Sequence, residues 1–315
     1  MSTADTNPVS TNTDASPTDG VDPRVLFMLD DPTQTGTDAS ALAASVRRAD
    51  PADPQISVLD LAVTRGDGIF ETLDAIDGFG QALEPHLARL ANSARLLDLP
   101  APCLDLYREG IRQGIAASTD PRLSVKLVLT RGIEGAGRCT GWVFVDPEPD
   151  FTEARTHGLK VVTLDRGYRH DVAQTSPWLL QGAKTLSYAV NKSVYREAER
   201  RGADDVIFIS SDGFVLEGPT STVVLQFGRH LVTPSTDQGI LAGTAQAAFF
   251  EYAEANGLKT AYRTVTPDEL HAADSVWLAS SVRQIVPIVE IDGVARGFDA
   301  ELHTAALDYL VSRRS

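Results

Sequence analysis

Lys184 is the residue whose type and setting most readily suggest covalent chemistry. It follows a glycine and an alanine in QGAKTLSY (residues 181–188), where the pattern predicts the start of a helix. The 28 basic residues include only five lysines, namely Lys126, Lys160, Lys184, Lys192 and Lys259. A lysine becomes a Schiff-base nucleophile when loss of solvent or a nearby cation lowers its pKa. Small and apolar neighbours are suited to this, although an ordinary surface lysine fits the spacing as well.

Glu217 is a candidate partner for a protonated ring nitrogen. It lies in DGFVLEGPTSTVV (residues 212–224), within a strand predicted over residues 215–227, and it is followed by a run of small residues. A carboxylate placed where an apolar strand meets a turn of small residues accepts a hydrogen bond from a cationic ligand. Taken alone, the same pattern also fits a solvated acid at a strand end.

Several residues are suited to hold an anion. Thr244 and Ala245 follow a glycine at a predicted helix start, where free N–H groups and the helix dipole favour negative charge. Simple capping by Thr244 is the alternative. Ser281 and Arg283 follow an apolar strand and offer a hydroxyl and a guanidinium to a phosphate or carboxylate. Arg89 lies beside the apolar stripe of a predicted helix and can point into a cleft or into solvent.

The elements that must position these residues follow from hydrophobic periodicity. Helices are predicted at residues 84–99, 104–118, 243–257 and 267–273, and one more begins near Lys184. Strands are predicted at residues 25–30, 123–132, 141–146, 158–164, 206–210, 230–234, 260–266 and 275–281. Residues 56–76 predict a strand, a glycine turn and a second strand.

The order of these elements predicts an α+β fold in two parts. Residues 1–22 are almost free of large apolar side chains and predict a disordered polar tail. A proline-rich, acidic break at residues 146–154 separates an N-terminal α/β domain, residues 23–150, from a C-terminal domain, residues 151–315. The length of 315 residues is ample for two domains.

Composition excludes some classes of partner. The net charge of −15 argues against binding to nucleic acid or to an anionic membrane. No apolar run approaches the roughly 20 residues of a membrane span, and no secretory signal is visible, so a cytoplasmic location is expected. The two cysteines and six scattered histidines form no metal-binding pattern, and no metal is expected.

Together and in this order, the motifs resemble those of one family. They are GDGIFET, HLARL, a lysine at a predicted helix start, the motif DGFVLEG about thirty residues after that lysine, GILAGT and a final SSVR. This set resembles the class IV aminotransferases, which are fold-type IV pyridoxal-phosphate enzymes. The family includes branched-chain and D-amino-acid aminotransferases, (R)-amine transaminases and 4-amino-4-deoxychorismate lyase. The resemblance covers residues 56–290 and implies a smaller N-terminal domain and a larger C-terminal, cofactor-binding domain with a barrel-like sheet.

The resemblance implies roles for the candidate residues. Lys184 would form the Schiff base with pyridoxal 5'-phosphate and then move the substrate Cα proton, and Glu217 would pair with the pyridine nitrogen. The cofactor phosphate would be held by the guanidinium of Arg89, the amides of Thr244 and Ala245, and the hydroxyl of Ser281. Substrate-binding positions would be Phe70, Thr72, Arg138, Tyr188 and Arg283.

Some positions depart from the family pattern. The usual Gly-Ile-Thr-Arg is replaced by GTAQ at residues 243–246, so one phosphate hydroxyl is displaced or lost. Arg138 comes about two positions later than the carboxylate-binding arginine of the D-amino-acid and lyase branches, which leaves Arg138 and Arg283 as competing candidates. Tyr188 is one residue closer to the lysine than the corresponding tyrosine of the branched-chain branch.

The resemblance leaves two reactions open. Thr72 matches a threonine characteristic of the lyase branch, and KTLSYAVN with EGPTST resembles proteins that carry the lyase label. We therefore expect a 4-amino-4-deoxychorismate lyase, which eliminates pyruvate and leaves 4-aminobenzoate. A transaminase of D-amino or branched-chain amino acids is the alternative, and a non-catalytic cofactor-binding relative is a remote one. The family further implies a homodimer with the active site near the interface and a small amino compound as substrate.

Overall fold

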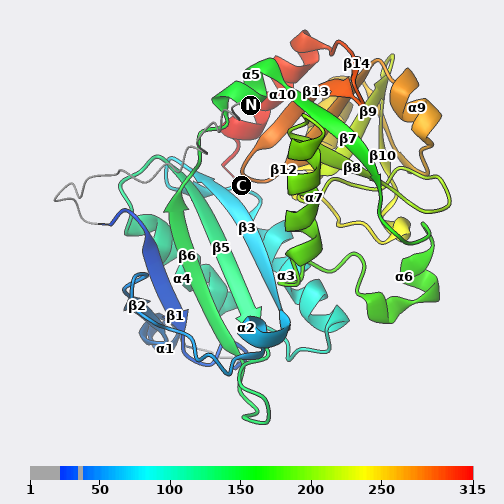
Figure 1. Cartoon of the computed structure of the whole chain (residues 1–315). Helices are drawn as coiled ribbons and strands as arrows, with labels where there is room; N and C mark the ends of the chain where they lie inside the picture. The colour runs from blue at the N-terminus through cyan, green and yellow to red at the C-terminus, as the bar shows by residue number, and fades with distance from the viewer. Residues whose placement is uncertain (1–21, 35–37, 315) are drawn as a thin grey trace, which may run out of the picture.

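The structure, a computed structural model, describes residues 22–34 and 38–314. The predicted tail, residues 1–22, lies outside this range except for its last residue. Figure 1 shows two sheets side by side, with the N-terminal segments in one and the C-terminal segments in the other. In these described residues no helix is long and apolar enough to cross a membrane.

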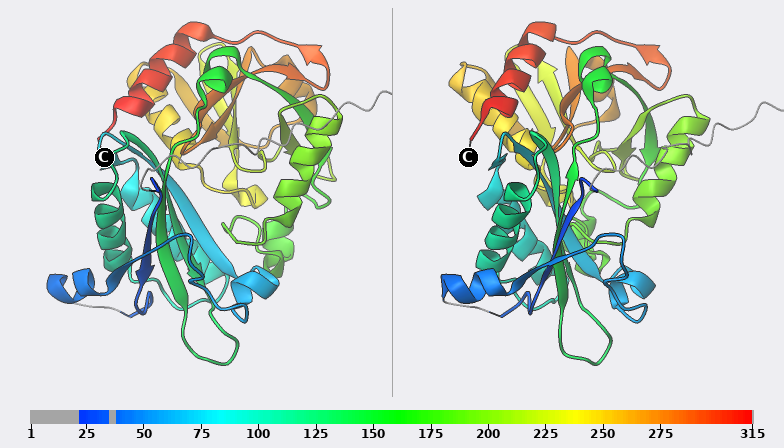
Figure 2. Two further views of the ribbon diagram at one scale, coloured as in Figure 1. Left: turned by 60° about the vertical axis from the view of Figure 1, so that its left-hand side comes forward. Right: turned by 90° about the vertical axis from the view of Figure 1, so that its left-hand side faces the viewer.

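The first sheet is antiparallel and has the strand order β2-β1-β6-β5-β3-β4. Its strands are β1 (Val25–Leu29), β2 (Val46–Ala49), β3 (Gly68–Ile76), β4 (Phe79–Gly80), β5 (Arg122–Thr130) and β6 (Thr140–Pro147). Helices α3 (Leu83–Leu96) and α4 (Leu104–Ala116) cover one face of it (Figure 2). Their apolar stripes pack onto inward-facing strand residues such as Ile69, Leu73 and Val143 and form one hydrophobic core.

The second sheet is mixed and has the order β11-β10-β9-β12-β13-β7-β8, with β14 added beside β13. Its strands are β7 (Leu159–Asp165), β8 (Asp205–Ile209), β9 (Thr222–Phe227), β10 (His230–Pro234), β11 (Lys259–Arg263), β12 (Ser275–Ser280), β13 (Gln284–Ile291) and β14 (Val294–Ala295). Helices α8 (Thr244–Ala255) and α10 (Ala300–Ser312) pack together on one side of it around Phe249 and Trp277.

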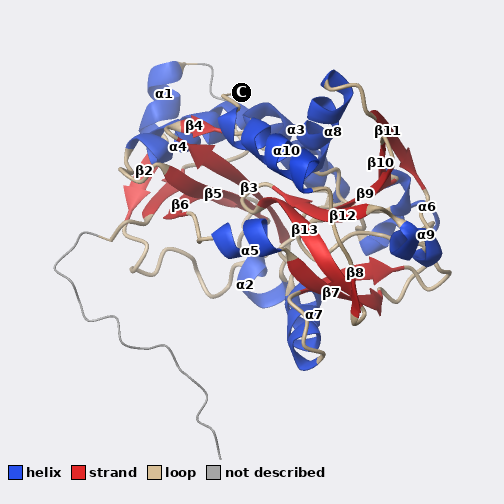
Figure 3. Cartoon of the chain, turned by 90° about the horizontal axis from the view of Figure 1, so that it is seen from above, coloured by secondary structure: helices blue, strands red, loops and turns tan. Residues whose placement is uncertain are grey.

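Further helices connect these elements. They are α1 (Ala39–Ala44), α2 (Leu61–Arg65), α5 (Thr152–His157), α6 (Val172–Thr175), α7 (Ala189–Arg200) and α9 (Pro267–Ala272), with single 3-10 turns at Pro177–Leu179 and Thr236–Gln238. In the view of Figure 3, α3, α4, α8 and α10 lie on one side of the two sheets, and α2, α5 and α7 lie on the other. The expected two-part α+β architecture, with a curled second sheet, is confirmed. The sheets divide between β6 and β7, beside the predicted boundary, although the domain limits themselves stay a prediction.

Residues 56–65 differ from the prediction. The expected first strand is replaced by a turn and by α2. The Asp60 side chain accepts a hydrogen bond from the N–H of Ala62, and Gly66 ends the helix in the left-handed conformation at φ 69°. An N-cap aspartate and a glycine just past the end are a complete pair of helix signals, and they outweigh the alternation of apolar residues.

The segment around Lys184 also differs from the prediction. Helix α7 begins at Ala189, and Lys184 lies in an extended segment before it. This segment pairs with β3: Phe70 N–H donates to Lys184 O at 3.0 Å, and Leu186 N–H donates to Gly68 O at 2.8 Å. A side chain at Gly68 would place its Cβ 2.8 Å from the backbone oxygen of Leu129 on the neighbouring strand β5, so glycine is required at this position. Backbone groups used in this way are not available for a helix.

Glu217 lies before a strand and not within one. Strand β9 begins at Thr222, and the intervening residues 218–221 form a turn that contains Pro219. The backbone of Glu217 is held by β8, because Phe208 N–H donates to Glu217 O at 2.9 Å. The proline cannot donate a ladder hydrogen bond, which explains why the predicted continuous strand is interrupted.

Candidate active site

A cavity of about 1230 Å³ lies between the two sheets and collects most of the predicted residues. Those that line it are Phe70, Thr72, Arg89, Lys184, Tyr188, Glu217, Thr244, Ala245, Ser281 and Arg283. They come from β3, α3, the segment before α7, α8, the connection before β9 and the turn between β12 and β13. The chain therefore brings together ten side chains or backbones that are far apart in sequence.

The amine of Lys184 is placed for nucleophilic chemistry. Its Nζ lies 4.6 Å from the centre of the Phe70 ring, and its backbone N–H donates to Ser93 Oγ on α3 at 3.1 Å. Burial lowers the pKa of Lys184 to about 8, against the attraction of the Glu71 and Glu217 carboxylates. A larger fraction of the amine is therefore unprotonated near neutral pH than in an ordinary lysine.

Glu217 faces the same cavity with its carboxylate held in place. Its Oε2 accepts a hydrogen bond from the N–H of Leu241 at 3.1 Å. Burial raises the pKa of Glu217 to about 7, although the Leu241 N–H and the Lys184 cation oppose this rise. A carboxylate in this condition gains strongly from a cationic hydrogen-bond donor, because such a donor offsets its loss of hydration.

Arg89 belongs to a buried ionic network that the sequence did not predict. Its Nε and Nη2 donate to the two carboxylate oxygens of Glu71, both at 2.7 Å, and its Nη1 donates to Ala242 O at 2.6 Å. His86 Nδ1 lies 2.8 Å from Glu71 Oε2. Burial alone would raise the pKa of Glu71, but Arg89 and His86 outweigh it and lower this pKa to about 2. Glu71 is therefore a fixed negative charge that orients Arg89.

The far side of His86 connects this network to two hydroxyls. Thr244 Oγ1 and Ser281 Oγ each lie 3.1 Å from His86 Nε2 and 3.0 Å from each other. Burial lowers the pKa of His86, so the neutral ring donates from Nδ1 to Glu71, and its Nε2 accepts a hydrogen bond from a hydroxyl. Beside these hydroxyls, α8 begins without a side-chain cap, and the N–H groups of its first turn are suited to bind an anion.

The predicted substrate-binding residues do not all line the same cavity. Phe70 and Tyr188 pack edge to face with ring centres 5.2 Å apart, and Thr72 lines the cavity beside them. Arg283 lines the cavity edge, but its Nη2 is 2.8 Å from Oδ2 of the buried Asp205. Arg138 is exposed in the connection between β5 and β6 and lines neither described cavity. The role of either arginine toward a substrate carboxylate stays a prediction.

Glu71, His86 and Lys126 are cavity or network residues that sequence reasoning missed. His86 and Arg89 are three residues apart on α3, which places them on one face, and this spacing is a usable signal. Glu71 lies between the cavity-lining residues Phe70 and Thr72, so its side chain points to the opposite face of β3, toward α3. Lys126 is opposite Thr72 on β5 and lies 5.2 Å from the Phe70 ring.

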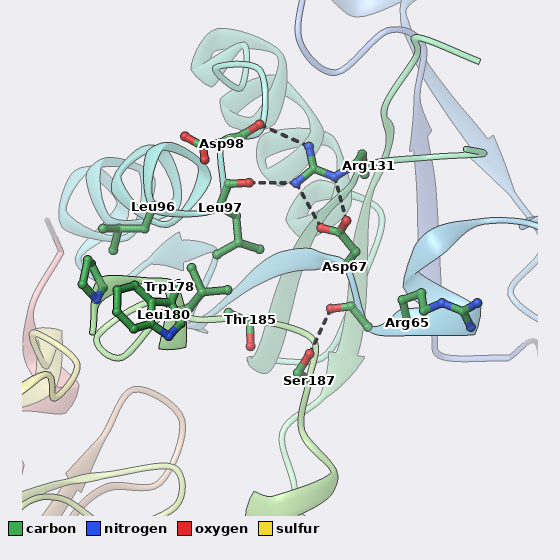
Figure 4. A pocket seen from close by; sticks show the side chains of 12 residues that line it. Arg65, Asp67, Leu96, Leu97, Asp98, Arg131, Trp178, Leu180, Thr185 and Ser187 are labelled. Atoms are coloured by element: carbon green, nitrogen blue, oxygen red, sulfur yellow. Dashed lines mark hydrogen bonds and ion pairs between the residues drawn. The ribbon is translucent and has the colours of Figure 1, made fainter. Parts of the chain in front are cut away.

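A second cavity, of about 570 Å³, lies on the other side of the Lys184 segment, and Figure 4 shows it from close by. Arg131 dominates it, with Nε 2.6 Å from Asp67 Oδ2 and further bonds to the carbonyls of Leu97 and Asp98. Both cavities share Leu180, Thr185 and Ser187. Arg131 and Asp67 are thus paired with each other, and their contacts lie beside the segment that carries Lys184.

Comparisons with known proteins agree with this arrangement. The family model for amino-transferase class IV matches residues 68–291. A relative from Mycobacterium tuberculosis, named bifunctional aminodeoxychorismate lyase / D-amino acid transaminase, is 44% identical over 254 residues, which cover 77% of this chain and 88% of that protein. The solved structure of a fold IV transaminase from Curtobacterium pusillum is 52% identical with a TM-score of 0.88, covering 92% of this chain and 99% of that one.

A further solved structure holds the cofactor. It is described as the PLP-bound form of a hypothetical aminotransferase from Mycobacterium tuberculosis, and it is 38% identical with a TM-score of 0.83, covering 91% of this chain and 99% of that one. The family model spans the Lys184, Glu217, Thr244 and Ser281 positions. The chain therefore belongs to the class IV aminotransferases, a family of pyridoxal 5'-phosphate enzymes.

Proposed function

We propose that the chain eliminates pyruvate from 4-amino-4-deoxychorismate and leaves 4-aminobenzoate. Its membership of a pyridoxal-phosphate family supplies the reaction type, and the name of the 44% identical relative includes this lyase activity. Thr72 supports the choice from within the site, because it lines the cavity at a position characteristic of the lyase branch in sequence. The observation that carries the proposal is the meeting of Lys184, Glu217 and the two hydroxyls in one cavity.

The residues present fit the cofactor. An amine with a lowered pKa, a carboxylate in need of a cationic partner and a group of hydroxyls at a helix N-terminus match its aldehyde, its ring nitrogen and its phosphate. Lys184, Glu217, Thr244 and Ser281 would hold these groups, with Ala245 supplying a further amide and Arg89 a nearby positive charge. When bound, the cofactor supplies an electron sink for the carbon that carries the substrate amine.

Lys184 would serve as the proton carrier of the reaction. Once released from its own bond to the cofactor, its amine would take the proton from the carbon that carries the substrate amine. Glu217 would keep the ring nitrogen protonated throughout, because the ion pair is stronger in a site shielded from water. Phe70 and Tyr188 would exclude water from the amine and give the substrate an apolar wall.

Amino transfer from D-amino acids is the second candidate. The same relative carries the name of a D-amino acid transaminase, and the 52% identical structure is described as a transaminase. Both reactions begin with removal of the same proton by Lys184. The walls of the cavity then select between them, because they decide which substrate can be held with its leaving group or its carboxylate in place.

The test is release of 4-aminobenzoate from enzymatically generated aminodeoxychorismate by the cofactor-loaded protein. Lys184→Ala is the control for dependence on the site, and Lys160→Ala, on the exposed surface of β7, is the matched control. We expect release by the wild type and by Lys160→Ala, and none above background by Lys184→Ala. No release by a protein that carries the cofactor and transfers amino groups from D-amino acids would favour the second candidate.

We also propose that two copies of the chain form a homodimer. Val58, Leu59 and Val63 are 75%, 64% and 61% exposed, and Ile133 in the β5–β6 connection lies beside them, joined through the Asp60–Ile133 bridge. Exposed apolar side chains gathered in this way are typical of an interface. A second copy seated here would bring Arg138 of this connection toward its partner. Light scattering tests the proposal, and a monomer at assay concentration would contradict it.

A further inference from the structure

The turn that carries Ser281 is held by side chains from outside it. Its three successive carbonyls each accept a side-chain hydrogen bond. Ser281 O accepts from Gln284 Nε2 at 2.7 Å, and Val282 O and Arg283 O accept from Arg155 at 2.8 and 3.1 Å. The position of the Ser281 hydroxyl is thus set by residues that do not line the phosphate end of the cavity.

Gln284 connects this turn to the first sheet. It is buried and has a φ of 61°, a conformation that residues with a side chain adopt uncommonly. Besides its bond to Ser281 O, Nε2 donates to Asp74 Oδ2 on β3 at 2.8 Å. One amide group therefore holds the turn and ties it to the sheet that also carries Glu71, and these bonds compensate for the unusual backbone conformation.

Asp74 and Gln284 each retain one unsatisfied oxygen. Asp74 Oδ1 and Gln284 Oε1 are both buried and have no hydrogen-bond partner in the described structure. An ionised carboxylate and an amide oxygen are both acceptors only, so they cannot satisfy each other. A proton on Asp74 supplies the missing donor, and a carboxylic acid and an amide then form a two-bond pair.

The charges around Asp74 are compatible with a neutral acid. Arg122 of β5 has Nη2 at 3.8 Å from Asp74 Oδ2, but its Nε is 2.5 Å from Glu148, which also pairs with Arg155 at 2.5 Å. Arg155 and, after α10, Arg313 are further positive charges that act on Asp74. Burial, followed by the nearby Glu148 carboxylate, raises the pKa of Asp74 to about 7. Two of the three neighbouring arginines, Arg122 and Arg155, are thus already paired with Glu148.

We propose that Asp74, as a protonated carboxyl group paired with Gln284, positions the Ser281 turn for the cofactor phosphate. Asp74 is a positioning residue, since it touches neither cofactor nor substrate. Its ionisation would place two acceptor oxygens against each other and loosen the turn. The inference rests on the proposed role of Ser281 as a phosphate ligand, so the experiment must test both separately.

The experiment measures the dissociation constant of pyridoxal phosphate by absorbance, from about pH 6 to about pH 9, for the wild type, Asp74→Asn and Asp74→Ala. Asparagine can donate to Gln284 Oε1 at every pH, so it copies the protonated acid. We expect Asp74→Asn to bind as tightly as the wild type at low pH and more tightly above about pH 7. Asp74→Ala is expected to bind roughly fivefold to tenfold more weakly at low pH, the size of one buried hydrogen bond.

Further variants separate a folding defect and a wrong Ser281 assignment from a wrong inference. Gln284→Gly suits the positive φ and removes the pair, so it should weaken binding like Asp74→Ala while circular dichroism stays native. Pyridoxal, which lacks the phosphate, should bind equally to all variants. If Ser281→Ala binds the phosphate form normally, the assigned phosphate site is wrong. If Ser281→Ala is weakened but the Asp74 and Gln284 variants match the wild type at every pH, the present inference alone is overturned.

Discussion

The two ends of the cavity are built differently. At the end that holds Thr244 and Ser281, polar side chains bond to one another in a continuous network through His86, Glu71 and Arg89. At the other end, no hydrogen bond of the described structure involves the side chains of Thr72, Lys126 or Lys192, which also line the cavity. A network of satisfied polar groups has one arrangement, whereas unpaired side chains can adapt to a ligand. The first end is suited to a constant cofactor and the second to substrate choice.

The largest effect, on the free energy of unfolding, is expected from removing the charge of Glu71 in the network behind Thr244 and Ser281. Glu71→Gln leaves the buried Arg89 without its counter-charge, and loss of one partner of a buried pair costs about 3–5 kcal/mol of unfolding free energy. Denaturant unfolding measures this loss. Glu84→Gln breaks a mostly exposed pair with Arg108 and should cost under about 1 kcal/mol. Equal losses in the two variants would contradict the larger stabilisation expected from the buried Glu71–Arg89 pair.

The stabilisation that Glu71 gives to the fold should also depend on pH. The folded-state pKa of Glu71 is about 2, below the ordinary 4.5, so its stabilisation is present above pH 4.5 and is lost as the pH falls toward 2. The gap in stability between wild type and Glu71→Gln should therefore narrow over this range in acid unfolding experiments. A constant gap would show that Glu71 is not ionised in the fold.

Glu217→Gln tests the carboxylate between the two ends. We expect turnover to fall by roughly 10²-fold while the cofactor stays bound, because the phosphate end is unchanged and only the charge opposite the ring nitrogen is lost. Steady-state rates and the cofactor absorbance measure the two effects separately. Glu199→Gln, in an exposed position on α7, is the control and should behave as wild type. Loss of cofactor with preserved turnover of the bound fraction would assign Glu217 to binding alone.

The lowered pKa of Lys184 predicts how fast the cofactor attaches to the apoprotein. Only the unprotonated amine reacts, so the rate should rise about tenfold per pH unit below pH 8 and level off above it. Stopped-flow absorbance measures the rate. A rate that keeps rising toward pH 10 would show that Lys184 behaves as a solvated lysine and that burial does not activate it.

The smallest effect is expected at the end of the cavity that is lined by Thr72, Lys126 and Lys192. Lys126→Met removes a positive charge from this end of the cavity. Burial and then the nearby Lys192 cation lower the pKa of Lys126, so its charged form is already disfavoured. We expect the KM for a carboxylate substrate to rise roughly threefold to tenfold, with an unchanged dissociation constant for the cofactor. Lys160→Met, in an exposed ion pair with Glu290, is the control. A change in cofactor affinity would show that the ends are not independent.

The sequence predicted which residues form the site better than it predicted the secondary structure that carries them. Lys184, Glu217, Thr244 and Ser281 sit in short motifs, and all four line one cavity. Lys184 was expected at a helix start, but its segment pairs with β3 more than a hundred residues earlier, and such long-range pairing leaves no local signal. Glu71 and His86 were not predicted as site residues because their roles depend on the packing of α3 against β3. Helix α10 and strand β13 were not predicted.

The most direct test of the account is to find which lysine carries the cofactor. The cofactor-loaded protein is reduced with borohydride, digested and mapped by mass spectrometry. The account predicts a single pyridoxyl adduct on Lys184, whose amine faces Glu217, Phe70 and the phosphate end of the cavity. An adduct on Lys126 or Lys192, which line the same cavity, or no adduct on a protein that turns over, would contradict it.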